Sequence, residues 1–178
     1  SVEEGRATAR ALIDAADEPS PEAYQYGTDG EGADTLLVTQ GGSRPAQDAH
    51  KPRHRKRRPS ALYMDGPSLI SFTVGQVPKL TDSILRKAGM TFDQIDLFLM
   101  HQATRKLLEQ LQLRFELDEN RMPILLEHCG NTVSSTLPIL IDGLRGQGRL
   151  TPGMRNLMVG FGVGWSWAGC VWTETWRS

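Results

Sequence analysis

Hydrophobic residues in the last two-thirds of the chain recur in blocks whose spacing alternates between the strand period and the helix period. A short apolar run, ALYM at residues 61–64, precedes a helical pattern over residues 67–88. Asp65 favours the start of this helix and Gly89 favours its end, whereas Pro78 inside it predicts a kink or a loosened turn. One face of the helix is expected to be buried.

The next block centres on a nearly continuous apolar strand. TFDQ at residues 91–94 has Thr91 and Gln94 at capping-box spacing, and IDLFLM at residues 95–100 follows it. Strands of this composition are usually covered on both faces. The order strand, loop and helix then repeats, with a helical pattern over residues 103–115, MPILLE at 122–127, the turn CGNT at 129–132 and a helical pattern over 133–144.

A β-hairpin is predicted at the end of the chain. The turn GRLTPG at residues 148–153 leads into NLMVGFG at 156–162, and residues 165–176 then alternate in polarity. Helices between buried strands, followed by a hairpin, favour a layered α/β domain with a mixed sheet largely covered by helices. Residues 1–178 are expected to form a single domain.

The first third of the chain is predicted to be less regular. ATARALIDA at residues 7–15 indicates a strand, and residues 24–43 are turn-rich around the short strand TLLVT. The run HKPRHRKRRP at residues 50–59 is basic, but it lacks the interleaved aromatic residues of a nucleic-acid surface, and a solvated loop is favoured. Residues 17–60 are therefore expected to be loop-rich, with a basic loop at 50–59 and no nucleic-acid partner.

Composition narrows the class of protein. The 178 residues are 39% hydrophobic and 23% charged, with a formal net charge of −1, which is typical of a soluble globular domain. No apolar run approaches the roughly 20 residues that a membrane helix needs. Two cysteines and an amino terminus without an apolar segment favour a reducing, cytoplasmic location.

Three segments carry residues that are suited to catalysis or ligand binding. His101 directly follows the apolar strand, at the sheet edge where open α/β folds usually place functional groups. Asn131 lies in the CGNT turn, and FGVG at residues 161–164 allows backbone N–H groups to approach a ligand. Each has an ordinary structural interpretation: a hydrogen-bonding histidine, a turn asparagine and a tight hairpin.

Taken together, HQA at residues 101–103, GNT at 130–132 and FGVGWSWAG at 161–169 resemble the carboxyl-terminal half of a ketoacyl-acyl-carrier-protein synthase III, a thiolase-fold condensing enzyme. The order and spacing of the motifs agree, and the resemblance runs from about Leu62 to Trp176. It implies a layered thiolase-like half, the carboxyl-terminal domain only.

The resemblance implies a decarboxylative Claisen condensation of an acyl thioester with malonyl-acyl-carrier protein in fatty acid or polyketide biosynthesis. By the family pattern, His101 and Asn131 donate hydrogen bonds to the malonyl thioester carbonyl. The backbone N–H of Val163 contributes to a second oxyanion site. Acyl-CoA and malonyl-carrier protein are the implied substrates, and no cofactor is implied.

The family's reactive cysteine belongs to an amino-terminal half that this chain does not contain, so the chain alone is expected to be inactive. Cys129 and Cys170 are expected to be packing residues. Lys106 matches a basic position implicated in carrier-protein docking, and Arg105 adjoins it. Thr104 stands where many synthases have Asn, which implies altered contacts with CoA or carrier protein.

Other interpretations remain open. The chain can be a non-enzymatic assembly or acyl-carrier-binding module, or an acyltransferase to an alcohol or amine. GWSWA at residues 164–168 resembles a serine-hydrolase elbow but lacks the following helix, and His101, His128 and Cys129 lack zinc-ligand spacing, so no metal is predicted. The face that packs on the missing half is expected to be apolar and to favour a homodimer.

Overall fold

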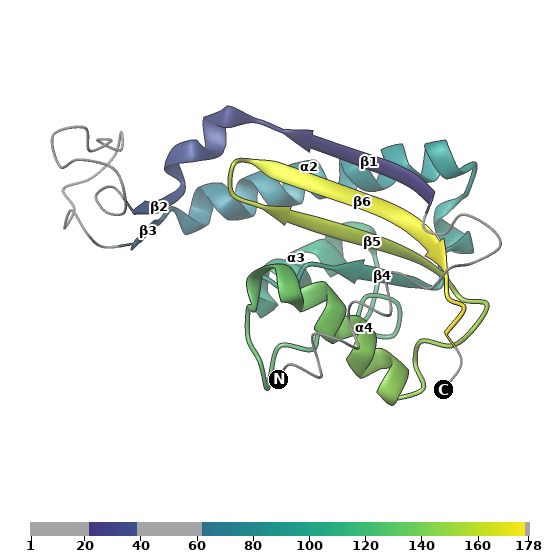
Figure 1. Cartoon of the computed structure of the whole chain (residues 1–178). Helices are drawn as coiled ribbons and strands as arrows, with labels where there is room; N and C mark the ends of the chain where they lie inside the picture. The colour runs from purple at the N-terminus through teal and green to yellow at the C-terminus, as the bar shows by residue number, and fades with distance from the viewer. Residues whose placement is uncertain (1–21, 39–61, 177–178) are drawn as a thin grey trace, which may run out of the picture.

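A mixed four-stranded sheet forms the centre of the computed structural model, which describes residues 22–38 and 62–176 (Figure 1). Its strand order is β1–β6–β5–β4, with β4 parallel to β5 and the other neighbours antiparallel. The predicted layered α/β fold and the terminal hairpin are confirmed. The strands are β1 (Glu22–Thr28), β4 (Leu97–Met100), β5 (Arg155–Gly162) and β6 (Ser166–Thr173).

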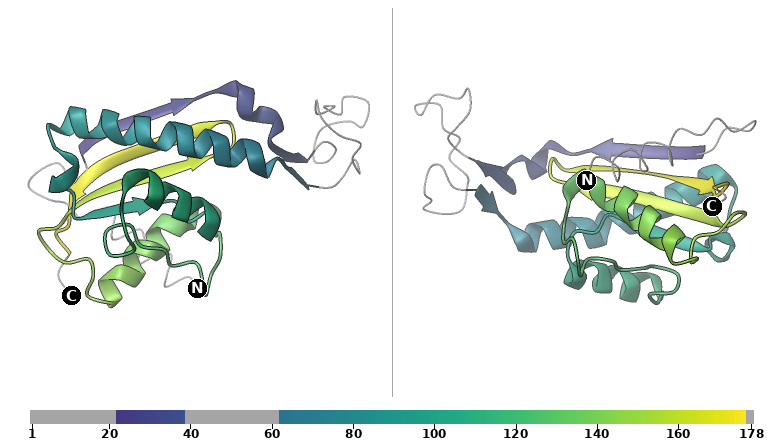
Figure 2. Two further views of the ribbon diagram at one scale, coloured as in Figure 1. Left: turned by 180° about the vertical axis from the view of Figure 1, so that it is seen from behind. Right: turned by 60° about the horizontal axis from the view of Figure 1, so that its bottom comes forward.

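One face of the sheet is covered by the long helix α2 (Gly66–Ala88), as Figure 2 shows. The Asp65 side chain accepts from the N–H of Ser68 at its start, and Gly89 ends it with a φ of 66°. The helix continues through Pro78. Its buried face contributes about 1.5–3 kcal/mol for each large apolar side chain, and it includes Val77, Leu80, Ile84 and Leu85.

Two shorter helices complete the layers. Helix α3 (Arg105–Phe115) places Leu108 and Leu111 in the same core as α2. Helix α4 (Thr136–Gly146) lies on the opposite face, where Leu140 and Leu144 pack against β4. Strand β4 is therefore buried on both sides, as its uniformly apolar sequence predicts. Within residues 22–38 and 62–176, three short 3-10 helices connect these elements: η1 (Gly30–Asp34), η3 (Phe92–Gln94) and η4 (Val133–Ser135).

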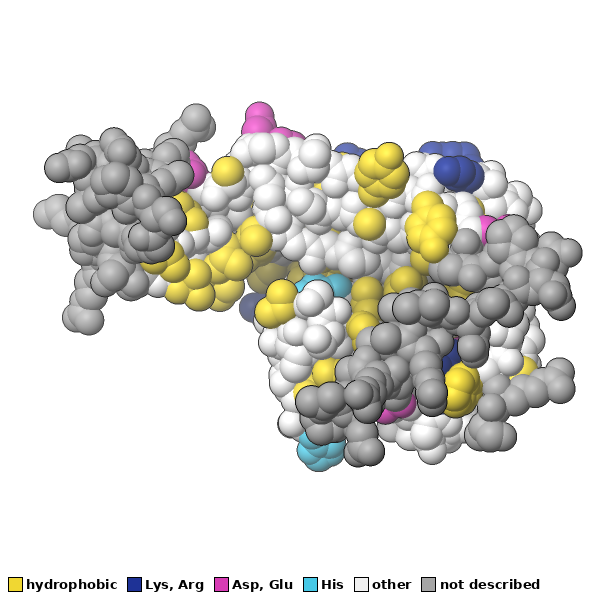
Figure 3. Space-filling model, viewed as in Figure 1, with side chains coloured by type: hydrophobic (Ala, Val, Ile, Leu, Met, Phe, Trp, Pro, Cys, Tyr) yellow, Lys and Arg dark blue, Asp and Glu magenta, His cyan; other side chains and the backbone are white. Residues whose placement is uncertain are grey.

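A separate two-stranded ribbon pairs β2 (Leu36–Val38) with β3 (Leu62–Met64). These strands confirm the predictions from TLLVT and ALYM. The ribbon exposes Val38, Leu62 and Met64, and Figure 3 shows hydrophobic side chains gathered over this end of the molecule. The predicted strand at residues 7–15 and the basic loop at 50–59 lie outside the described residues.

Two sequence predictions are wrong. Residues 24–28, the start of the stretch at 24–43 that was predicted to be turn-rich, belong to β1, an edge strand that pairs with β6. Residues 122–127 do not form a strand, although Met122 and Ile124 are buried. The segment lies beside β4, where Phe98 N–H donates to the Arg121 carbonyl at 2.7 Å, but Pro123 has no N–H with which to continue a ladder.

The sheet face opposite α2 is only partly covered by described residues. Trp167 packs toward Phe72 of α2, so Ala168 and its register partner Tyr26 point the other way. Helix α4 covers the β4 end of that face, whereas Tyr24 and Tyr26 on β1 are 54% and 84% exposed. Among the described helices, none is long and apolar enough to cross a bilayer.

Candidate active site

His101 lies at the carboxyl end of β4, as its position after the apolar strand predicts. Its backbone N–H donates to the Val159 carbonyl at 2.8 Å and so extends the β4–β5 pairing by one residue. Because both faces of β4 are packed, the backbone that carries His101 is held firmly.

The His101 side chain is half-buried between the hairpin and the start of α4. Its ring meets Phe161 edge to face, with centroids 5.3 Å apart, and Nδ1 lies 2.5 Å from the Thr136 hydroxyl oxygen. Burial lowers the pKa of His101 below its usual value because the charged ring loses solvation. The imidazole is therefore predominantly neutral at pH 7.

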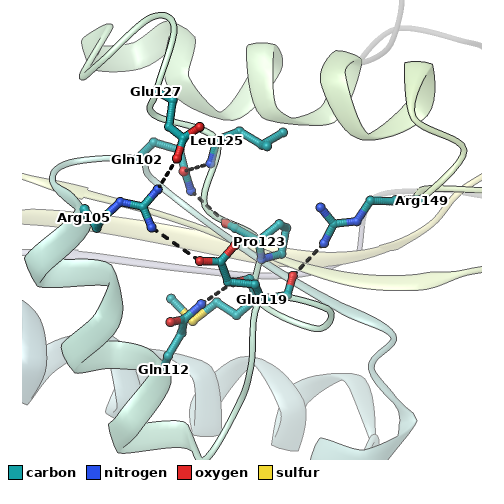
Figure 4. A network of polar contacts seen from close by, with 9 residues as sticks. Gln102, Arg105, Gln112, Glu119, Pro123, Leu125, Glu127 and Arg149 are labelled. Atoms are coloured by element: carbon teal, nitrogen blue, oxygen red, sulfur yellow. Dashed lines mark hydrogen bonds and ion pairs between the residues drawn. The ribbon is translucent and has the colours of Figure 1, made fainter.

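Gln102 fixes the backbone around His101 and was not singled out from the sequence. Its side chain is buried, and its amide nitrogen donates to the Met100 carbonyl at 2.9 Å and to the Pro123 carbonyl at 3.3 Å, the second of which Figure 4 shows. Its amide oxygen accepts from the N–H of Leu125 at 2.9 Å. The side chain thus supplies the hydrogen bonds that a regular strand at residues 122–127 would have made. The sequence signal that could have identified Gln102 is a polar residue directly after an apolar strand.

Asn131 lies on the exposed loop that leads into η4 and α4. Its side-chain oxygen accepts from the N–H of Val133 at 2.9 Å, which fixes the amide plane. Its amide nitrogen has no acceptor among the described residues. The loop requires a φ of 63° at Gly130 and 58° at Val133, and a β-branched residue in this conformation costs about 1–3 kcal/mol. Strain of this kind is concentrated at functional sites.

Thr136 connects the two candidate donors. Its hydroxyl contacts His101 and also lies 3.1 Å from the Val133 carbonyl, while the N–H of Val133 bonds to Asn131. A series of polar contacts therefore links the end of β4 to the loop before α4. The structure brings together two segments that lie 30 residues apart in the sequence.

The hairpin that contains Val163 is the third segment at this site. Val163 is 37% exposed, and its N–H has no backbone acceptor among the described residues. Asp29 and Trp165 exchange backbone hydrogen bonds, and Trp165 stacks on Phe72 with centroids 4.3 Å apart. These contacts hold the hairpin tip beside η1 (Figure 1).

The predicted contact residues at the start of α3 differ in their surroundings. The Thr104 hydroxyl caps the helix by accepting from the N–H of Leu107 at 3.2 Å. Arg105 is engaged in ion pairs with Glu119 at 3.4 Å and Glu127 at 3.0 Å (Figure 4). Lys106 is exposed and has no ion pair within the described ranges.

The two cysteines and the hydrolase-like motif have different surroundings. Burial raises the pKa of Cys170 to about 11. Cys129 is exposed, with its sulfur 3.5 Å from the Leu125 carbonyl, so the expectation that it is a packing residue is wrong. Ser166 begins β6, so a strand and not a helix follows it. Residues 22–38 and 62–176 contain no group of three metal-ligating side chains.

Comparison with known proteins relates this arrangement to one family. The model described as "3-Oxoacyl-[acyl-carrier-protein (ACP)] synthase III C terminal" matches residues 85–173, half of the chain. A beta-ketoacyl-[acyl-carrier-protein] synthase III of Caldanaerobacter subterraneus is 31% identical over 146 residues, 82% of this chain and 43% of that protein. One from a Synechococcus species is 27% identical over 165 residues, 90% of this chain and 47% of that protein.

Comparison with solved structures points to the same family. A crystal structure of a 3-oxoacyl-(acyl-carrier-protein) synthase III has a TM-score of 0.81 and 38% identity, covering 91% of this chain and 50% of that one. A 3-oxoacyl-(acyl-carrier protein) synthase from Burkholderia xenovorans has a TM-score of 0.75 and 35% identity, covering 85% and 44%. The chain spans less than half the length of the two curated relatives. The chain belongs to the 3-oxoacyl-[acyl-carrier-protein] synthase III family, in the part of it that the family model describes as C terminal.

Proposed function

We propose that this chain is the carboxyl-terminal catalytic half of a condensing enzyme that joins an acyl thioester to malonyl-acyl-carrier protein. In that reaction the malonyl carboxylate leaves as carbon dioxide, and the electron pair of the broken C–C bond becomes an enolate. The enolate carbon then attacks the acyl thioester on a cysteine, forms a new C–C bond and releases the thiolate. His101 and Asn131 act in the first step.

The observation that carries this proposal is the series of polar contacts that links His101 through Thr136 and Val133 to Asn131. It holds a neutral imidazole and a carboxamide, two groups that donate hydrogen bonds without carrying charge, on neighbouring segments. Donors fixed before reaction stabilise a developing oxyanion without reorganising. Malonyl decarboxylation requires such stabilisation at the thioester carbonyl.

The second oxyanion site is assigned to the hairpin. The Val163 N–H sits at a tip held by Asp29 and by the stack of Trp165 on Phe72. A backbone donor on a tethered turn suits the tetrahedral oxygen that forms when the enolate attacks. The remaining donor and the cysteine nucleophile are assigned to an amino-terminal half.

Carrier-protein contact is assigned first to Lys106. Its ammonium group is exposed without an ion pair in the described part of the chain, so it is available to an acidic partner. Arg105 is already paired with Glu119 and Glu127, which weakens its attraction for such a partner. The Thr104 hydroxyl is engaged as a helix cap, so any contact of Thr104 with CoA shares that hydroxyl.

Supplying an amino-terminal half of a 3-oxoacyl-acyl-carrier-protein synthase III in trans tests the proposal. Acetyl-CoA and malonyl-carrier protein are given to each half alone and to the mixture, and 3-ketoacyl product and carbon dioxide are measured. We expect both products in equal amounts from the mixture only. His101→Ala and Asn131→Ala should each lower the rate by roughly 10²–10³.

His128→Ala is the matched control for His101, because His128 is an exposed histidine outside this series of contacts and its substitution should leave the rate unchanged. A well-folded mixture that binds carrier protein without forming product would favour the assembly-module alternative. Acyl transfer without carbon dioxide release would favour an acyltransferase. Either result would refute the condensing function.

A further inference from the structure

The Thr136 hydroxyl lies between two hydrogen-bond partners but has only one proton to donate. One partner is Nδ1 of His101 at 2.5 Å, and the other is the carbonyl oxygen of Val133 at 3.1 Å. A hydroxyl can donate one bond and accept others, so the direction of its proton decides which His101 nitrogen is protonated. If the proton points to Nδ1, the neutral ring carries its own proton on Nε2. If it points to Val133, Nδ1 must be the protonated nitrogen.

The backbone at the start of α4 favours the first arrangement. The Val133 carbonyl already accepts a hydrogen bond from the backbone N–H of Thr136, so it does not need the hydroxyl. Nδ1 has no other partner among the described residues and lies on a half-buried ring. The two distances favour the same direction, because 3.1 Å to the Val133 carbonyl is longer than the about 2.5–3.0 Å usual for a hydroxyl donor, whereas 2.5 Å to Nδ1 falls within that range and is shorter than the about 2.7 Å at which N–H donors begin.

We propose that Thr136 is a positioning residue that donates its hydroxyl proton to Nδ1 of His101 and thereby holds the neutral imidazole in the Nε2–H form. Thr136 is 2% exposed and is the first residue of α4, so its hydroxyl is fixed by the helix and by the packing beneath it. The sequence separation of 35 residues makes this contact a product of the fold.

The consequence for catalysis rests on the function proposed above. A ring with a proton on Nε2 can donate to a thioester carbonyl. A ring with its proton on Nδ1 instead presents the lone pair of Nε2 to the carbonyl, and this lone pair repels the developing oxyanion. Thr136 therefore determines whether His101 is an oxyanion donor, although Thr136 itself does not touch the substrate.

Nitrogen-15 NMR of the chain measures the tautomer directly and requires no activity. The chain is labelled with ¹⁵N-histidine, and long-range ¹H–¹⁵N correlations are recorded above the pH at which His101 titrates. The His101 signals are assigned by their absence in His101→Gln. We expect a pure Nε2–H pattern in the unmodified chain.

Two substitutions separate the hydroxyl from the shape of the side chain. Thr136→Val keeps the shape but removes the donor, and we expect His101 to become a mixture of both tautomers. Thr136→Ser keeps the hydroxyl and should restore the Nε2–H pattern. An Nδ1–H pattern in the unmodified chain, or an unchanged pattern in Thr136→Val, would overturn the proposal.

The reconstituted reaction distinguishes this proposal from the function on which its consequence rests. Thr136→Val should lower kcat toward the roughly 10²–10³-fold loss expected for His101→Ala, and Thr136→Ser should recover most of the rate. A mixture that forms no product despite the Nε2–H pattern would refute the condensing function and leave the tautomer assignment standing. Full activity in Thr136→Val would refute the positioning role alone.

Discussion

The neutral imidazole of His101 makes stability depend on pH. Burial lowers the pKa of His101 in the folded chain, so the unfolded chain binds more protons between that value and the ordinary value of about 6.5. The free energy of unfolding should therefore rise with pH through this window and fall as the pH is lowered below about 6.5.

Urea unfolding of the chain and of His101→Gln at several pH values checks this sign. The difference in unfolding free energy between the two proteins isolates the contribution of His101 from that of the carboxylates, which titrate at neighbouring pH values. We expect the chain to lose stability relative to His101→Gln as the pH falls through the window. A difference that is constant with pH would show that folding does not perturb His101.

The residues to which we assign a direct role were easier to single out from the sequence than the residues that we propose support them. His101, Asn131 and Val163 lie in motifs with their own local pattern, and the structure places all three segments at one site. Thr136 and Gln102 act through partners 35 and 23 residues away. Because no local pattern encodes such distances, only the fold identifies their roles.

At the scale of elements, the hairpin depends on a close approach between η1 and Trp165. A Cβ atom at Gly32 would lie 2.4 Å from the Trp165 ring and 2.5 Å from its backbone nitrogen. Gly32→Ala should therefore displace the hairpin tip and destabilise the fold by about 1–3 kcal/mol. The change is measured by urea unfolding and by the ¹H–¹⁵N signal of Val163.

Gly30→Ala is the control, since a Cβ there meets no atom within 4 Å. It lies in the same 3-10 helix and should leave both measurements nearly unchanged. If Gly32→Ala also left the unfolding free energy and the Val163 signal unchanged, the contact between η1 and Trp165 would not hold the hairpin tip.

Helix α4 is tied to the end of the sheet by a buried ion pair. Arg145 donates two hydrogen bonds from Nη2 to the two carboxylate oxygens of Glu174, both at 2.9 Å, and the side chains are 14% and 1% exposed. Arg145→Met leaves a buried carboxylate without its partner and should cost about 3–5 kcal/mol in urea unfolding.

The exposed pair of Arg105 with Glu127 provides the comparison. Glu127→Gln should change stability by no more than about 1 kcal/mol, because its side chain is 71% exposed and the pair is screened by solvent. Similar losses for the two substitutions would contradict the assignment of Arg145 and Glu174 as the structural pair.

The elements that the sequence predicts well are those with long, one-sided apolar patterns. Helix α2 and strand β4 are buried where their patterns indicate. Strand β1 was missed because its glycine and exposed tyrosines read as turn and surface residues, and only pairing with β6 makes them a strand. Residues 122–127 carry a strand-like pattern, but Pro123 has no N–H with which to continue a ladder. The Gln102 side-chain amide makes hydrogen bonds to this segment instead.

At the scale of the whole molecule, the part of the sheet that the described residues leave uncovered predicts association. Tyr24 and Tyr26 lie exposed on the face away from α2, beyond the region that α4 covers. We expect the chain alone to form a homodimer through this face, because an exposed aromatic surface on a sheet favours burial against a second copy.

Sedimentation velocity over a range of concentrations measures this association. Tyr26→Arg should shift the chain toward monomer, since it introduces charge at the most exposed tyrosine of the face. Leu113→Arg is the control, because Leu113 is 73% exposed on α3, away from the face. A monomer at all concentrations would contradict the predicted homodimer.

We propose that this chain activates the malonyl thioester while another half supplies the nucleophile. The most direct measurement is carbon dioxide release from malonyl-carrier protein by the reconstituted mixture, with the reactive cysteine of the amino-terminal half replaced by alanine. Release should persist without acyl transfer and fall by roughly 10²–10³ in His101→Ala and in Asn131→Ala. Carbon dioxide release at an unchanged rate in both variants would contradict this proposal.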